Sequence, residues 1–209
     1  MGKAFAIAGF CLCTCLCEMS VAATWYVDGS VSASGDGKAW ATAFKQIQEG
    51  IDAASHGDTV IVAEGTYVEN IHFNGKNIVL TSTDPLDPTV VAATIIDGNQ
   101  SGSVVTFSGT EDEASTLSGF TICNGQAYRG GGICGGLKSY ITHATIEHNV
   151  ITGNVARGEP HANGGGLALC DGPILNNTIS ENVAKFGGGL SRCNGTIRGN
   201  SVKDNRASS

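Results

Sequence analysis

One motif occurs three times in the second half of this chain. The segments Thr145–Ala156, Pro173–Ala184 and Thr196–Ala207 all fit the pattern x-I-x-x-N-x-[I/V]-x-x-N-x-A. Glycine triplets at 130–132, 164–166 and 187–189 stand 34 and then 23 residues apart, each followed by Ile or Leu. A short repeated unit cannot bury an apolar face alone, so the pattern predicts a solenoid in which each repeat stacks on its neighbours.

Alignment of the repeats places identical residue types in columns. The asparagine columns are Asn149, Asn177 and Asn200, and Asn154, Asn182 and Asn205; the aliphatic columns are Ile146, Ile174 and Ile197, and Ile151, Ile179 and Val202. We interpret each repeat as one turn of a coil with three short strands, stacked in parallel at about 4.8 Å with the aliphatic columns inside. Because asparagine tolerates left-handed backbone angles and its amides can hydrogen-bond along a stack, both Asn columns are predicted to be structural bends. A degenerate copy, Leu117–Ala127, has Phe120 in the first Asn column.

The region before the repeats begins with an expected strand, loop and helix, over residues 24–57. The helix is predicted over Thr42–Ser55, with Thr42 as N-cap and Phe44, Ile47 and Ile51 on one apolar face. It is the one helix expected after the leader, and we expect it to close one end of the coil. From residue 58 to 209 the chain reads as short β segments separated by turn residues, and the segment Thr89–Ile96 is one of them.

The first 23 residues are typical of a secretory signal. A basic start is followed by an apolar run and then by Val21-Ala22-Ala23, which predicts cleavage after Ala23. The apolar run is shorter than the roughly 20 residues that span a bilayer, so no membrane span is expected after cleavage. We expect the mature chain to be secreted or held on the outer cell surface.

These motifs resemble the right-handed parallel β-helix proteins of the pectin-lyase-like superfamily, and the repeats of polymorphic outer-membrane proteins. The resemblance rests on the glycine triplets, on "FTICNG" at 120–125 and on the opening through "GDTVIVAEGTY" at 57–67. It implies an all-β fold, a right-handed parallel β-helix solenoid with an N-terminal amphipathic capping helix. It implies little about activity, because one fold supports many functions.

No set of catalytic residues is predicted. Cleavage of acidic polysaccharides requires two or more carboxylates, or a Ca²⁺ cluster, in one cleft. The expected outer columns are chemically mixed: Glu147, Leu175 and Arg198, and Thr152, Ser180 and Lys203. A formal net charge of −7 and the lack of a basic stripe also argue against a nucleic-acid partner.

A few residues remain as candidate sites. Glu111, Asp112 and Glu113 are consecutive carboxylates, which indicate either solvated charge or a Ca²⁺ site; no other cofactor is expected. Cys170 and Cys193 are equivalent in the repeat, and stacking one turn apart would allow either a disulfide or a buried pair of thiols. Arg192 falls where Leu169 points inward, so we expect either a strand ending at Ser191 or a frayed last turn.

Two functions are compatible with this sequence. The first is a non-catalytic secreted or cell-surface β-helix with a structural, adhesive or glycan-binding role, its partner a polysaccharide or surface glycan. The alternative is a polysaccharide lyase or glycoside hydrolase with active residues near Arg157–Asn163 or in further turns. The motif runs to the last residues without a terminal cap, so we expect the coil to be truncated at the C-terminus.

Overall fold

The computed structural model describes residues 21–136, 140–158, 160 and 162–207. The predicted secretory signal lies almost entirely outside these residues, as do Glu159 and His161 of the loop near Arg157–Asn163. Among the described residues, no helix is both long enough and apolar enough to cross a membrane.

The described residues form four parallel sheets, which we number I to IV in the order that the later turns visit them. Sheet I contains β1 (Thr24–Val27), β2 (Thr59–Val62), β5 (Val79–Ser82), β8 (Thr116–Ser118), β12 (Thr145–Glu147), β16 (Ile174–Leu175) and β20 (Ile197–Arg198). Sheet II contains β3 (Gly65–Val68), β6 (Thr94–Asp97), β9 (Thr121–Cys123), β13 (Val150–Thr152), β17 (Thr178–Ser180) and β21 (Ser201–Lys203). Sheet III contains β10 (Gln126–Ala127), β14 (Val155–Ala156), β18 (Val183–Ala184) and β22 (Arg206–Ala207). Sheet IV contains β4 (Ile71–His72), β7 (Val105–Thr106), β11 (Ile133–Cys134), β15 (Leu167–Ala168) and β19 (Leu190–Ser191).

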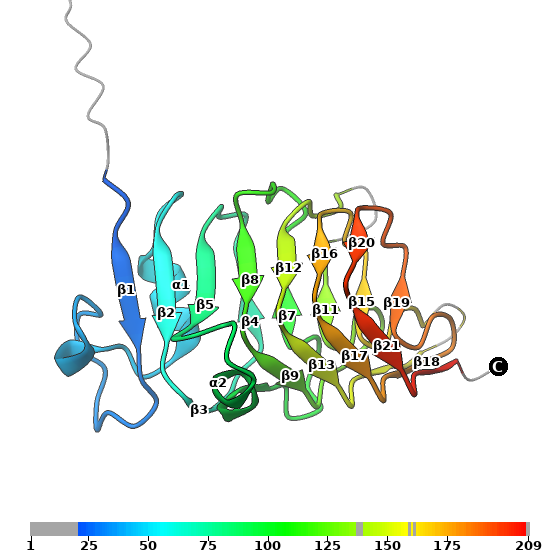
Figure 1. The fold of residues 1–209 in the computed structure, drawn as a ribbon, viewed down its shortest axis with the longest axis horizontal. Helices are drawn as coiled ribbons and strands as arrows, with labels where there is room; N and C mark the ends of the chain where they lie inside the picture. Colours follow the sequence, from blue (N-terminus) through cyan, green and yellow to red (C-terminus); the bar gives the residue numbers. More distant parts are fainter. Residues whose placement is uncertain (1–20, 137–139, 159, 161, 208–209) are drawn as a thin grey trace, which may run out of the picture.

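The chain passes from sheet to sheet and then returns to sheet I one strand further along, so each circuit is a turn stacked on the one before. Figure 1 shows this stacking from β1 at the left to β20 at the right. The first two complete turns, β2–β4 and β5–β7, use sheets I, II and IV, as the predicted three strands per turn require. From β8 onward each turn adds a short strand in sheet III, so the later turns have one more side than predicted.

The core consists of aliphatic columns that run along the stack. In sheet I the registered column is Val60, Leu80, Leu117, Ile146 and Ile174, and every member is fully buried. Sheet II has its own registered column, Ile96, Ile122, Ile151 and Ile179, and every member is likewise fully buried. Both aliphatic columns predicted from the repeat are confirmed by this register. Each fully buried side chain of this size contributes about 1.5–3 kcal/mol, so stacking of turns is what stabilises the fold.

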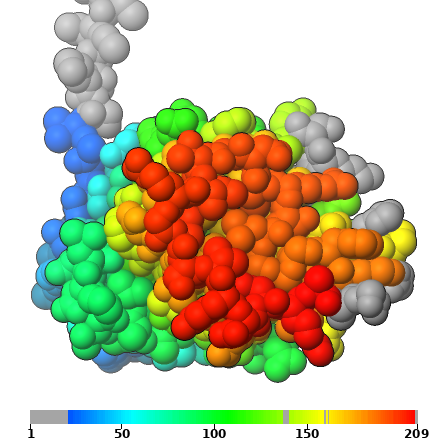
Figure 2. All heavy atoms as spheres, turned by 45° about the vertical axis from the view of Figure 1, so that its right-hand side comes forward, coloured from blue at the N-terminus to red at the C-terminus, as the bar shows by residue number. Residues whose placement is uncertain are grey.

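The last turn is the exception to this burial. Ile197 and Val202 continue the two columns but are 46% and 51% exposed, because no further turn covers β20 and β21 in the described structure. Figure 2 shows the atoms of the last described residues, in red, uncovered on the face of the molecule that it presents. Arg192, at the end of the turn before the last one, is exposed, and β19 ends at Ser191, as one of the two sequence alternatives predicted.

The N-terminal helix is shorter than predicted. The structure has a 3-10 turn, η1 (Trp40–Thr42), and a separate helix, α1 (Ile47–Ala53), so the prediction of one helix over Thr42–Ser55 is wrong. Phe44 leaves the helical path because its backbone N–H donates to Tyr26 at 2.9 Å and its carbonyl accepts from Asp28 at 2.8 Å, which covers the outer edge of β1. The helix begins after Gln46, not Thr42, and the Glu69 carboxylate accepts from the N–H groups of Ile47 and Gln48 at 2.9 and 3.1 Å.

A second helix was not expected. The segment Thr89–Ile96, predicted as a strand, is divided between α2 (Pro88–Ala93) and β6. The signals for this helix are local: the Asp87 carboxylate accepts from the Thr89 N–H at 2.8 Å, and Pro88 occupies the first helical position, where its missing N–H has no cost. Figure 1 shows α2 in the connection from β5 to β6, outside the stacked strands.

The glycine triplets are needed for two separate features, the backbone angle of a bend and the close approach of neighbouring turns. The first glycine of each is left-handed, and Gly164 has φ of 65°. The next permits close stacking: a Cβ on Gly165 would lie 2.5 Å from the carbonyl oxygen of Gly188 in the next turn. The triplets are therefore required both by the bend and by the distance between turns.

Candidate functional site

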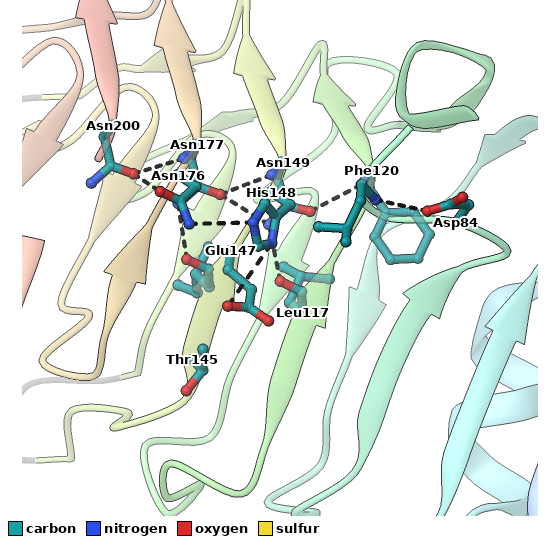
Figure 3. Close-up of polar contacts among 12 residues, drawn as sticks. Asp84, Leu117, Phe120, Thr145, Glu147, His148, Asn149, Asn176, Asn177 and Asn200 are labelled. Atoms are coloured by element: carbon teal, nitrogen blue, oxygen red, sulfur yellow. Dashed lines mark hydrogen bonds and ion pairs between the residues drawn. The ribbon is translucent and has the colours of Figure 1, made fainter. Parts of the chain in front are cut away.

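The first asparagine column is a hydrogen-bonded ladder inside the bend between sheets I and II. The side-chain oxygen of Asn149 accepts from the Phe120 N–H at 3.0 Å, and its amide nitrogen donates to the Leu117 carbonyl at 2.9 Å. Asn177 repeats this on the next turn: its side-chain oxygen accepts from the backbone N–H and side-chain amide of Asn149, at 2.9 and 3.2 Å. Asn200 does the same for Asn177, at 2.8 and 3.0 Å. Figure 3 shows the three amides in line.

The second column forms a matching ladder between sheets II and III. The side-chain oxygen of Asn182 accepts from the backbone N–H and side-chain amide of Asn154, at 3.0 and 3.1 Å. Asn205 accepts in the same way from Asn182, with both distances 3.0 Å. Asn149, Asn154, Asn177 and Asn182 are all at most 1% exposed. These six residues satisfy buried backbone groups and hold the bends, which is a structural role.

The prediction that the ladder asparagines adopt left-handed angles is wrong. The residue before each ladder position carries the positive φ, as at His148 (55°) and Asn176 (54°) in the first column and Glu181 (58°) and Asp204 (54°) in the second. The ladder residue itself turns its amide inward across the bend. Asparagine is needed there because one short side chain must both accept from and donate to backbone groups of the preceding turn.

The three consecutive carboxylates do not converge. Glu111 is 1% exposed, and its carboxylate accepts backbone N–H groups from Ser108 and Gly109 at 2.8 Å, from Gly75 at 3.0 Å and from Thr110 at 3.1 Å. Asp112 and Glu113 are exposed, and the Asp112 carboxylate accepts from the Ala114 N–H at 2.9 Å. Glu111 therefore organises its own loop. Across the described residues no three His, Cys, Asp or Glu side chains come together as ligands for a metal ion.

Cys170 and Cys193 lie on successive turns, as the repeat predicted, and both are free thiols, as are Cys123 and Cys134. The interaction with the Cys193 thiol and complete burial raise the pKa of Cys170 well above its ordinary value, while the Cys170 thiol donates to the Ala168 carbonyl and the Cys193 thiol to the Ser191 carbonyl, each at 3.5 Å. Cys134 stands outside this pair, because it is registered with Ala168 in sheet IV. The fold thus brings Cys170 and Cys193 together on successive turns as two free thiols.

A pocket of about 570 Å³ lies outside sheet IV, over β4, β7 and β11. Its strand side is formed by His72, Thr106 and Cys134, which occupy one registered column. Its other side is the connection that follows β10, with Tyr128 and Arg129, and the remaining lining residues are Ser103, Phe107, Ser108 and Ala127. The site thus combines an aromatic ring, a cation, three hydroxyl side chains and an imidazole in one concavity.

The charge of this pocket comes from Arg129. Its guanidinium carbon lies 5.5 Å from the centroid of the Tyr128 ring, within the range of a cation–π interaction. The Nε of Arg129 is buried without a hydrogen-bond partner among the described residues. The Arg129 carbonyl accepts from the Ser103 hydroxyl at 3.2 Å, which holds the backbone of this connection against the preceding turn.

Sequence reasoning did not identify Tyr128 and Arg129. Both precede a glycine triplet, and the equivalent positions in the next two turns pair by isolated bridges, Arg129 with Asn163 and Asn163 with Phe186. A signal was present, because the basic and aromatic residues Lys185 and Phe186 stand at the same place before a later triplet and also form a cation–π contact, at 5.9 Å. The early aromatics pack together instead, with Trp25 and Phe44 stacked at 6.0 Å.

The outer columns are registered as predicted, with Glu147, Leu175 and Arg198 on sheet I and Thr152, Ser180 and Lys203 on sheet II. Neither column carries a pair of carboxylates. Comparison of the chain with models of protein families, with curated proteins and with solved structures finds no match.

Proposed function

We propose that this chain is an exported, non-catalytic protein of the right-handed parallel β-helix type, and that it binds a carbohydrate in the Tyr128–Arg129 pocket. Right-handedness is supported by the strong preference of parallel strand crossovers for that hand. In this proposal α1 and the segment before it cap the first turn, and the signal at the N-terminus directs the protein to the outside of the cell. A polysaccharide or surface glycan is the proposed partner.

The observation that carries the proposal is the composition of the pocket. Sugars present both an apolar face and hydroxyl groups, and Tyr128 with Arg129 supplies a ring and a donor beside the hydroxyls of Ser103, Thr106 and Ser108. Glu111 is a buried acidic residue three positions after the lining residue Ser108. Both oxygens of its carboxylate already accept hydrogen bonds from backbone N–H groups. It is therefore not offered to a substrate as an acid or base, which favours binding over cleavage.

Binding is tested with the mature protein on a glycan array, followed by calorimetric titration of each positive glycan. We expect Tyr128→Ala and Arg129→Gln each to weaken binding about tenfold or more, which corresponds to about 1.4 kcal/mol. Tyr140→Ala is the matched control, because Tyr140 is 62% exposed and does not line the pocket. Equal affinities for the Tyr128→Ala protein and the unchanged protein would place the glycan elsewhere.

Catalysis is tested on the same preparation with pectic and alginate polymers, by release of unsaturated uronates and of new reducing ends. We expect neither product. Turnover that disappears in Arg129→Gln but persists in Tyr140→Ala would overturn the non-catalytic proposal and establish the lyase or hydrolase alternative.

A further inference from the structure

Ala23 stands immediately before β1 and is hydrogen-bonded to the first turns of the coil. Its backbone N–H donates to the Asp58 carboxylate at 2.7 Å, and its carbonyl accepts from the Thr59 N–H at 2.9 Å, as the first rung between β1 and β2. The two residues before it are exposed, Val21 to 88%. Ala23, the residue before β1, is thus hydrogen-bonded both to Asp58 and to the first residue of β2.

The Asp58 carboxylate, which accepts the hydrogen bond from the Ala23 N–H, is buried among neutral donors. Asp58 is 5% exposed, and its second oxygen accepts from the Trp25 indole at 3.0 Å and the Ser55 N–H at 2.9 Å. The nearby charged group is Lys76, whose ammonium is engaged with the carbonyls of Ile51, Asp52 and Ala54, each at 2.8 Å. The direct partners of the buried charge are therefore all neutral, although a buried carboxylate is better compensated by a cation.

Burial opposes ionisation of Asp58, but the hydrogen bonds from Ser55, Trp25 and Ala23 and the charge of Lys76 outweigh it, so the pKa of Asp58 is lowered. The carboxylate is accordingly charged at neutral pH. A positive charge at the nitrogen of Ala23 would lie 2.7 Å from its oxygen and would convert a neutral hydrogen bond into a charge-assisted ion pair.

We propose that the leader is removed between Ala22 and Ala23, and that the new α-ammonium of Ala23 binds the Asp58 carboxylate. The step is hydrolysis by the signal peptidase of the exporting cell: the water oxygen adds to the Ala22 carbonyl carbon as the Ala22–Ala23 amide breaks, both water protons end on the Ala23 nitrogen as an ammonium, and Ala22 is left with a carboxylate. Ser20 and Ala22 supply small residues at the recognition positions, as Val21 and Ala23 do for a cut one residue later. The inference rests on the proposed export.

The structure distinguishes these two cuts. Removal of Ala23 would delete both of its hydrogen bonds and leave the Thr59 N–H and one Asp58 oxygen without those partners. A cut before Ala23 retains both hydrogen bonds and adds the charge. Processing would then stabilise the first turn of the mature chain relative to its precursor, in which the same nitrogen is a neutral amide.

The first experiment determines the mature N-terminus by sequencing and intact mass after expression of the full chain in an exporting host. A chain that begins at Ala23 supports the proposal, whereas one that begins at Thr24 or elsewhere overturns it while leaving export intact. A chain that keeps its leader inside the cell overturns the proposed export and this inference together.

The second experiment does not depend on export. Chains beginning at Ala23, at Ala23 with an acetylated amine, and at Thr24 are released from a fusion partner, and their urea midpoints are compared. We expect the free Ala23 amine to give the highest midpoint, with the advantage over the acetylated chain lost well above the usual α-amino pKa of about 8. Asp58→Asn should abolish that advantage and the control Asp28→Asn should retain it; equal midpoints for the free and acetylated chains would overturn the ion pair.

Discussion

The side-chain oxygen of Asn177 accepts two hydrogen bonds from Asn149 of the preceding turn, one from the backbone N–H at 2.9 Å and one from the side-chain amide at 3.2 Å. The amide nitrogen of Asn177 donates in turn to the Ile146 carbonyl at 2.9 Å. The side chain of Asn177 thus forms hydrogen bonds with three polar groups of the preceding turn, inside a buried bend.

Substitution Asn177→Ala should therefore destabilise the protein strongly. The change removes the acceptor of the Asn149 backbone N–H and of one Asn149 amide hydrogen, and the amide that donates to the Ile146 carbonyl, so we expect a loss of roughly 2–4 kcal/mol in the free energy of unfolding. Urea unfolding followed by circular dichroism measures it. Asn176→Gly is the control, because Asn176 is exposed, has a positive φ that glycine accepts, and bonds His148 at 3.2 Å. Similar losses in both variants would contradict the ladder's role.

Glu111→Gln should destabilise the fold although it changes only one atom of the side chain. The Glu111 carboxylate accepts four backbone N–H groups, two on each oxygen, so an NH₂ in place of one oxygen would face two donors. We expect a loss of about 2–3 kcal/mol by urea unfolding, against almost none for the exposed neighbour Glu113→Gln. A Ca²⁺-dependent rise in the unfolding midpoint that requires Glu111 would instead identify it as a ligand.

Glu69 should make the fold less stable as the pH rises. Burial raises the pKa of Glu69 above its ordinary value of 4.5, and the Glu49 charge raises it further, against the N–H groups of Ile47 and Gln48. The folded state therefore holds the proton more tightly than the unfolded state, and stability falls as the pH passes from the ordinary value through the raised one. Glu69→Gln should lack this fall, and the exposed Glu64→Gln should retain it. Parallel pH profiles of unfolding for Glu69→Gln and the unchanged protein would refute the assignment.

Mild oxidation should link Cys170 to Cys193 in the folded protein. The two thiols lie on successive turns, each donates to the carbonyl two residues before it, at 3.5 Å, and those residues, Ala168 and Ser191, are registered with each other. A bridge would close a loop of about 24 residues, for which the chain-entropy estimate is about 3 kcal/mol of stabilisation. Peptide mapping after oxidation identifies the link and thermal unfolding measures its effect. The Cys193→Ser protein should show neither change, and a main product joining Cys123 or Cys134 would contradict the expected pairing.

The repeat predicted the interior of this protein well, because identical residues in successive turns have identical environments. The columns Ile146, Ile174 and Ile197 and the six asparagines follow from that symmetry alone. The symmetry did not indicate which residue at each bend adopts the left-handed backbone angle. Asparagine favours that angle, yet in the structure the preceding residue, such as His148, has the positive φ.

The parts that the sequence did not predict are those outside the repeat. Helix α2 depends on the local cap from Asp87. The β-branched residues that follow Asp87 are typical of a strand, so the sequence pattern predicted a strand in place of this helix. The burial of Glu111 depends on amides from Gly75, 36 residues away, and no local pattern encodes that contact. Tyr128 and Arg129 form a pocket only because the turn places them against His72 and Thr106 of earlier turns.

The asparagine ladders also have a direction. The side-chain oxygen of each rung accepts from the rung of the turn before it, as Asn205 accepts from the backbone N–H and the side-chain amide of Asn182, so each successive rung repeats the same contact. A unit of 23 residues that contains its own two rungs, its glycine triplet and its aliphatic columns can be duplicated or deleted as a whole without a change of register. The length of such a coil can consequently change by whole units without disturbing either ladder.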